Sequence, residues 1–190
     1  RINMTRLAPL NPEQLNESQK RVFNAIQEGP RGAMPLIGPF NVWVRTGDIG
    51  DAIQKLGASL RFESILAEDV KELLICTVGH HYKAKFEFAF HEQLALKAGI
   101  NESILNDLKA DRIPVIDDQK LKLAYLLAEQ LLDTHVIDNE YYAQGIEVFG
   151  ERGMLELVSI VGYYCLVSLT LNAFTIPLDE GMSDPFPEKK

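Results

Sequence analysis

The pattern of hydrophobic and polar positions predicts a chain built almost entirely of helices. Apolar residues recur at spacings of three and four along most of the sequence, and no stretch alternates with a two-residue period for long enough to predict a strand. The predicted helices cover 12–28, 48–62, 67–98, 101–109, 117–132, 138–149 and 151–173. No internal repeat, low-complexity tract or composition shift divides the chain, so the fold class expected over 1–190 is a single-domain, all-α helical bundle.

Glycine, proline and capping residues predict where these helices begin and end. Asn11 is expected to cap a first helix that starts at Pro12, and Gly79 is expected to kink the helix over 67–98. The segment 29–38, GPRGAMPLIG, predicts an extended loop that could cover a pocket. Gly150 separates the last two helices, and the chain from Pro177 onward reads as an irregular exposed arm.

These signals divide the single domain into three stretches. The N-terminal helices and the Gly/Pro loop occupy 11–66, a long helix-rich core occupies 67–176, and the irregular arm occupies 177–190.

Composition and charge exclude several classes of function. The net charge of −8 argues against nucleic-acid binding, because non-specific affinity for nucleic acid comes mainly from Lys and Arg that displace counterions. Hydrophobic content of 46% is ordinary for a folded globular protein. Only two cysteines occur, Cys76 and Cys165, which fits a reducing compartment, so cytoplasm is the expected location.

One segment, 157–177, carries no charged side chain and has nominally the length needed to span a bilayer. It contains several Ser, Thr, Tyr and Asn residues and lacks a flanking Lys/Arg cluster, so no membrane partner is expected. A helix that is apolar on all sides is also typical of a core or subunit-interface helix, which is the interpretation we favour.

The stretch from Glu72 to His91 combines ionisable groups with apolar surroundings and is the first candidate for chemistry. Glu87 and His91 are separated by one helical turn and can hydrogen-bond directly. If the helix is unbroken, His80 falls on the same stripe and Glu72 lies about 60 to 100° away around the axis, so that a kink could bring it in. A carboxylate fixes the tautomer of a neighbouring imidazole and raises its basicity, which favours proton transfer near neutral pH.

Two other interpretations of this stretch remain open. Glu87 and His91 could form an exposed pair worth only about 0.2–0.5 kcal/mol to the helix. A metal site made of His80, Glu87 and His91 is less favoured, because three ligands on one straight helix spread too far to meet at one ion. No metal is therefore expected.

A redox role for Cys76 or Cys165 is also less favoured. Each lies in an apolar run, which raises the pKa of a thiol, and neither has a neighbouring cysteine.

Several segments resemble the carboxymuconolactone decarboxylase and alkyl hydroperoxidase D superfamily. The core motif falls on 72–99, with its FEFAFHEQLALKAG ending, and further likeness lies in RGAMPLIGPF, Trp43, 60–63 and VGYYCLVSLTLNAFTIPL. The peroxidase branch has an acid, a CxxC pair and a histidine. Here the acid falls on Glu72 and the histidine on His91, whereas Ala84 and Glu87 occupy the cysteine positions, so the dithiol is absent.

The resemblance implies a decarboxylase-like enzyme that uses Glu72, Glu87 and His91 for proton transfer on a small organic acid or lactone, without a cofactor. It implies His81 or Arg61, with His80 nearby, as residues that hold a substrate carboxylate. It also implies a homotrimer or homohexamer assembled through helix 151–173. Two alternatives stay open: an antioxidant, peroxidase-like protein that uses Cys76, and a non-catalytic binding or assembly protein whose pocket is filled by side chains.

Overall fold

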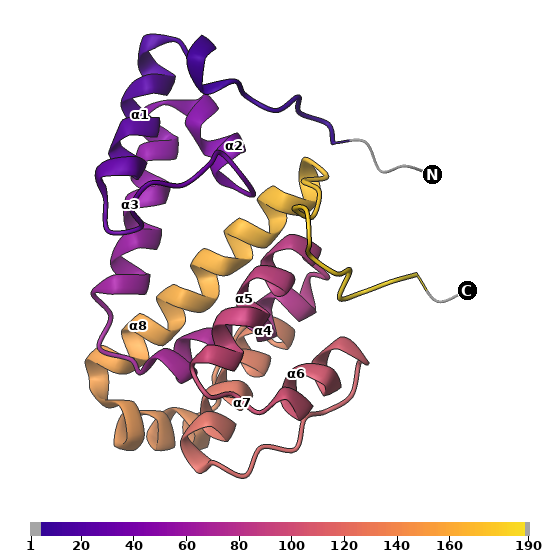
Figure 1. Ribbon diagram of the computed structural model, residues 1–190. Helices are drawn as coiled ribbons and strands as arrows, with labels where there is room; N and C mark the ends of the chain where they lie inside the picture. Colours follow the sequence, from indigo (N-terminus) through magenta and orange to yellow (C-terminus); the bar gives the residue numbers. More distant parts are fainter. Residues whose placement is uncertain (1–4, 189–190) are drawn as a thin grey trace.

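The computed structural model describes residues 5–188 and confirms an all-α, single-domain helical bundle (Figure 1). In chain order its elements are the 3-10 helix η1 (Pro12–Gln14), α1 (Glu17–Glu28), α2 (Phe40–Trp43), the 3-10 helix η2 (Val44–Thr46), α3 (Asp48–Phe62), α4 (Glu68–His81), α5 (Lys85–Lys97), α6 (Glu102–Lys109), α7 (Gln119–Asp133) and α8 (Asn139–Ala173). The buried α4 is the centre of the bundle and packs against α5, α7 and α8.

The first helix begins later than the sequence predicts. Asn11 caps only η1, and the cap of α1 is Asn16, whose side chain accepts from the Gln19 backbone N–H at 2.9 Å while Gln19 Oε1 accepts from the Asn16 N–H at 3.1 Å. This reciprocal capping box satisfies two N–H groups at once at the start of α1, whereas Asn11 satisfies only the Glu13 N–H of η1. The prediction of one continuous helix from Pro12 was therefore wrong, because the α-helix begins at Glu17.

The predicted helix over 67–98 is in fact two helices that fold back on each other. Helix α4 ends at His81, Lys83 adopts a left-handed φ of 49°, and the Ala84 N–H bonds to the Gly79 carbonyl oxygen at 2.9 Å. Gly79 itself stays helical and lies against Phe88 of α5, where a Cβ atom would make only ordinary van der Waals contact. The prediction of one helix kinked at Gly79 was wrong, because the reversal occurs at Tyr82–Ala84.

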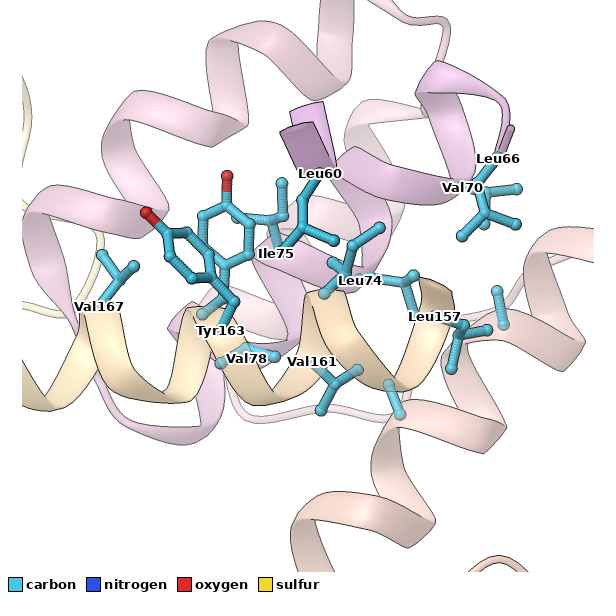
Figure 2. Packing of buried hydrophobic residues seen from close by; sticks show 14 of the residues in the cluster. Leu60, Leu66, Val70, Leu74, Ile75, Val78, Leu157, Val161, Tyr163 and Val167 are labelled. Carbon is cyan, nitrogen blue, oxygen red and sulfur yellow. The ribbon is translucent and has the colours of Figure 1, made fainter. Parts of the chain in front are cut away.

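Gly150 divides α8 into two segments, as predicted, with φ 71° and ψ 172° in the middle of the continuous assignment. Figure 1 shows the two segments meeting at a sharp angle. The second segment packs along α4, and Figure 2 shows Leu157 and Val161 of α8 next to Leu74 and Val78 of α4. By length and composition alone α8 could cross a membrane. Half of its most apolar stretch is, however, buried against the rest of the protein, as in a core helix.

The C-terminal arm is irregular, as predicted, but it is not free of the body. The Phe186 ring packs edge-on against Phe88 of α5 with centroids 5.0 Å apart, and Lys85 Nζ donates to Asp184 Oδ2 at 2.6 Å. The expectation of an exposed arm was wrong in this respect, because Phe186 covers apolar surface that the α4–α5 turn leaves open.

Candidate functional site

Two glutamates and a histidine form a continuous hydrogen-bonded chain inside the bundle. Glu72 Oε2 of α4 lies 2.6 Å from His91 Nδ1 of α5, and His91 Nε2 lies 3.1 Å from Glu87 Oε1. Glu72 is 1% exposed, and Glu87 and His91 are each 3% exposed. The interpretation of Glu87 and His91 as an exposed surface pair was therefore wrong.

The α4–α5 hairpin explains how residues far apart in sequence meet here. The reversal lays α5 against α4, so Glu72 faces His91 across the hairpin, and the one-turn spacing of Glu87 and His91 places both on one face of α5. The His91 ring is held edge-on between Tyr164 and Phe90, with centroids 5.4 and 5.3 Å away. These contacts fix the ring between its two carboxylic partners.

The two glutamates and His91 each affect the pKa of their neighbour. Burial alone lowers the pKa of His91, but Glu72 and Glu87 outweigh that effect and raise it above the ordinary 6.5. For Glu72 burial acts in the opposite direction and raises the pKa of the carboxyl. The positive charges of His91, Arg61 and Lys71 outweigh burial and bring this pKa below its ordinary value. Arg61 Nη2 lies 3.5 Å from Glu72 Oε1. Both carboxylates therefore favour the protonated form of the His91 ring.

A cavity of about 410 Å³ opens beside this chain of groups. Glu87 and His91 line the cavity, whereas Glu72, which contacts Nδ1 of the His91 ring, does not. Most of the wall is apolar and aromatic; the aromatic part comprises Phe40, Trp43, Phe62, Phe86, Phe90 and the two tyrosines Tyr163 and Tyr164. Such an apolar cavity with few convergent polar groups is typical of a small-molecule site.

The Gly/Pro loop over 29–38 forms one wall of this cavity, as the sequence predicts. Met34 is held by the Gln27 side chain, which donates to the Met34 carbonyl at 2.6 Å and accepts from its N–H at 2.9 Å. Gly38 has φ 55° and lies against the Phe86 ring, where a Cβ atom would overlap the ring. Glycine is therefore required for the loop to close over the cavity.

The remaining predicted substrate-binding residues divide into two groups. Arg61 lines the cavity, but His80 and His81 do not. His80 Nε2 lies 3.1 Å from Asp111 Oδ1, and His81 Nδ1 lies 3.9 Å from Asp133 Oδ1. The placement of His80 beside Glu87 and His91 assumed an unbroken helix, and His81 was expected from the resemblance alone; the reversal after His81 turns both of them away.

The alternative metal site of His80, Glu87 and His91 fails for the same reason, because His80 does not converge with the other two. Across residues 5–188 no group of three or more His, Cys, Asp or Glu side chains is arranged to hold a metal ion.

Cys76 lies in a separate core cluster with Leu73 and Phe88, outside the cavity wall. Burial raises the pKa of its thiol well above the ordinary value, and neighbouring glutamates raise it further. Cys165 is half-buried, and burial raises the pKa of its thiol as well. Both cysteines are free thiols.

Sequence reasoning missed three polar residues of the cavity wall: Arg31, Tyr163 and Tyr164. Arg31 lies in the Gly/Pro loop, where no helical periodicity indicates which side chains are buried. Tyr163 and Tyr164 were interpreted only as polar positions in an apolar helix. Two adjacent phenols in a stretch without charge were the available signal, since a buried tyrosine hydroxyl usually faces a polar partner or a ligand.

No protein-family model matches the sequence, and no curated protein matches it significantly. Among solved structures, the fold is similar to that of the debrominase Bmp8 in its apo form, with a TM-score of 0.69 over 90% of this chain and 91% of that chain. The two sequences are 10% identical, so the likeness concerns the fold alone. The chain thus shares the all-α fold of that structure, in agreement with the helical bundle that its sequence predicts.

Proposed function

We propose that the protein is a cofactor-independent decarboxylase of the carboxymuconolactone decarboxylase type, acting on a small organic acid or lactone. The observation that carries this proposal is the Glu72–His91–Glu87 hydrogen-bonded chain, which ends at the wall of an apolar cavity. That a solved enzyme shares the fold is compatible with catalysis, but the reaction is argued from the site.

Decarboxylation needs a place for the electron pair that the departing CO₂ leaves behind. The C–C bond breaks, its electrons pass into a conjugated carbonyl or alkene of the substrate, and the resulting enolate carbon takes up a proton. The His91 imidazolium gives this proton, with Glu87 as its carboxylate partner, and solvent restores it after product release. An apolar wall disfavours the charged carboxylate more than the delocalised enolate, which lowers the barrier.

The geometry separates the roles of the three residues. His91 and Glu87 reach the cavity and are the catalytic acid–base pair. Glu72 contacts only Nδ1 of the ring and acts as a positioning residue that orients the ring and favours its protonated form. Arg61 contacts Glu72 and lines the cavity, so it can also bind an anionic group of the substrate.

The two alternative functions receive less support. A peroxidase-like reaction at Cys76 requires an accessible thiolate, but this thiol is fully buried and its pKa is raised. A non-catalytic assembly protein was expected to fill its pocket with side chains, whereas a cavity of about 410 Å³ stands beside His91.

A substrate screen on purified protein tests the proposal. Loss of γ-carboxymuconolactone and reduction of hydroperoxide are followed in parallel, with related unsaturated lactone acids added to the first arm. We expect His91→Ala to lower turnover by about 10²- to 10⁴-fold, the usual share of general acid–base catalysis, and Cys76→Ala to leave turnover nearly unchanged. Peroxide turnover that depends on Cys76 and not on His91 would overturn the proposal.

A further inference from the structure

Arg31 is the one cavity-lining guanidinium that no carboxylate in the described part of the chain neutralises. Its Nη1 donates to the Gln54 carbonyl oxygen at 3.1 Å and to Gln54 Oε1 at 3.3 Å, and its Cζ lies 5.2 Å from the centre of the Phe40 ring. The other cavity arginine, Arg61, pairs with Glu72. Arg31 thus brings an uncompensated positive charge to an apolar wall.

The contacts of Arg31 fix its position without using its full binding capacity. Gln54 is 4% exposed, and its Nε2 donates in turn to Asp51 Oδ1 at 3.0 Å, so the amide that holds Arg31 is itself locked. Only Nη1 of the guanidinium is engaged in this bond. A guanidinium carries five N–H donors, so Arg31 keeps donors for a ligand.

The Tyr163 hydroxyl lies next to Arg31. Both side chains rest against Gly57 of α3, where a Cβ atom would overlap the Tyr163 hydroxyl and lie 2.9 Å from Arg31 Nη2. Within residues 5–188 the Tyr163 hydroxyl has no hydrogen-bond partner, although Tyr163 is 7% exposed and lines the cavity. A phenol O–H beside a guanidinium can supply a second donor to an anion that binds the guanidinium.

An unpaired cation in a desolvated wall is unfavourable unless something binds to it. Burial lowers the pKa of Arg31 more than the neighbouring Tyr163 and Tyr164 raise it, and Arg61 lowers it further, so the surroundings disfavour the charged guanidinium. A bound carboxylate would remove that cost, because guanidinium–carboxylate hydrogen bonds are among the strongest that proteins form.

We infer that Arg31 and the Tyr163 hydroxyl form an anion subsite that binds the carboxylate of a flat, apolar-bodied acid in the cavity next to Glu87 and His91. The subsite rests on the proposed function in that it belongs to the same cavity. A guanidinium stabilises a carboxylate and therefore slows its loss as CO₂, so the anchored carboxylate is one that the substrate retains.

The cavity wall supplies the preference for a flat body. Trp43 meets Phe40 edge-on with centroids 5.5 Å apart, and the Phe86 and Phe90 rings are stacked at 6.1 Å. Aromatic faces and edges of this kind favour an unsaturated ring over a compact polar molecule. Specificity then comes from one charged contact at Arg31 and a broad apolar surface around it.

Trp43, the only tryptophan of the chain, lines the cavity and makes the inference directly measurable. Quenching of its fluorescence is titrated with benzoate and trans-cinnamate, and with the neutral amides benzamide and cinnamamide. Isothermal titration calorimetry gives an independent dissociation constant. We expect the two carboxylates to bind and the amides to bind much more weakly.

Arg31→Met should weaken carboxylate binding by about 10- to 100-fold and leave amide binding unchanged, as loss of one charge-assisted contact predicts. Arg31→Lys keeps the charge without the fork-like geometry and should give an intermediate affinity. Arg112→Gln, which removes an exposed arginine paired with Asp107, is the matched control and should change nothing. Thermal unfolding of each variant shows whether it is folded.

Equal binding of amides and carboxylates, an unchanged affinity in folded Arg31→Met, or no quenching by carboxylates up to about 10 mM would overturn the subsite. These outcomes are distinct from failure of the proposed function, because binding is measured without turnover. If Arg31→Met loses affinity and no lactone acid is decarboxylated, the subsite stands and the proposed reaction fails.

Discussion

Glu72 and His91 are nineteen residues apart in the chain, yet their side chains meet at 2.6 Å and both are almost fully buried. The hairpin between them is closed by only three residues, Tyr82 to Ala84, so the turn that breaks the predicted helix is also what creates the pair. A straight or gently kinked helix would have kept the two groups apart. The proposed chemistry therefore depends on this turn.

Replacing Glu72 by Gln should destabilise the protein by on the order of 3 kcal/mol at neutral pH, because it leaves the buried His91 without its closest counter-charge. Denaturation in urea measures the change. Glu92→Gln serves as the control, since it removes another carboxylate of α5 that is less buried and pairs with Lys109 instead of His91, and it should cost about 1 kcal/mol or less. Equal effects of the two changes would contradict the special role of Glu72.

The His91 ring should titrate above pH 6.5, because its pKa is raised in the folded state. Its contribution to stability is then fully present below pH 6.5 and is lost as pH rises through the folded pKa. Glu72 behaves oppositely: its folded pKa is lowered, so its contribution is present above pH 4.5 and is lost as pH falls through the folded pKa.

NMR of the imidazole carbon-bound protons follows this titration. Glu87→Gln should move the midpoint downward, because it removes one of the two carboxylates that oppose the effect of burial. A midpoint at or below pH 6.5 in the unaltered protein, unmoved by this substitution, would rule out the electrostatic effect of Glu72 and Glu87 on His91.

Gly38→Ala should lower the free energy of unfolding by about 2–4 kcal/mol, since it combines a left-handed φ of 55° with overlap of the new Cβ and the Phe86 ring. Gly32→Ala is the matched control in the same loop. Its φ is 74°, but open space surrounds the position, so only the backbone cost of about 1 kcal/mol is expected. The displaced Phe86 ring should also weaken benzoate binding in the Gly38 variant, while Gly32→Ala retains it.

Assembly into a trimer or hexamer through the second segment of α8 remains a prediction. Leu155, Val158, Leu166 and Leu169 are 64, 43, 40 and 54% exposed and recur at helical spacing. A continuous exposed apolar stripe of this kind is typical of a surface that another subunit covers. Analytical ultracentrifugation should detect an oligomer that Leu155→Lys combined with Leu169→Lys dissociates, and a monomeric unaltered protein would contradict the expectation.

Local signals in the sequence predicted most of the fold. Asn101 and Asp118 cap α6 and α7 through side-chain bonds to Ser103 N and Leu121 N, and Gly150 ends the first segment of α8. These features depend on a few neighbouring atoms, so they can be inferred from neighbouring residues. The turn at Lys83 could not be inferred in this way, because neither glycine nor proline marks its left-handed backbone and the reversal goes with the packing of α5 against α4.

The candidate site could be predicted only in part, for a similar reason. The Glu87–His91 pair follows from helical spacing, and it is present at 3.1 Å. The meeting of Glu72 with His91, the placement of Arg31 beside Tyr163, and the exclusion of His80 all follow from how separate helices pack. Such long-range contacts depend on tertiary structure, which the periodicity of a single helix does not contain.

The docked C-terminal arm has a consequence for the order in which the chain folds. Its bond from Lys85 to Asp184 joins residues 99 positions apart, and Phe186 rests on a surface that exists only after α4 and α5 have paired. Closing so large a loop costs chain entropy before any contact compensates for it, so the arm docks late. By the same reasoning it detaches first, and amide hydrogens near Phe186 should exchange with solvent well before those of the α4–α5 hairpin that it covers.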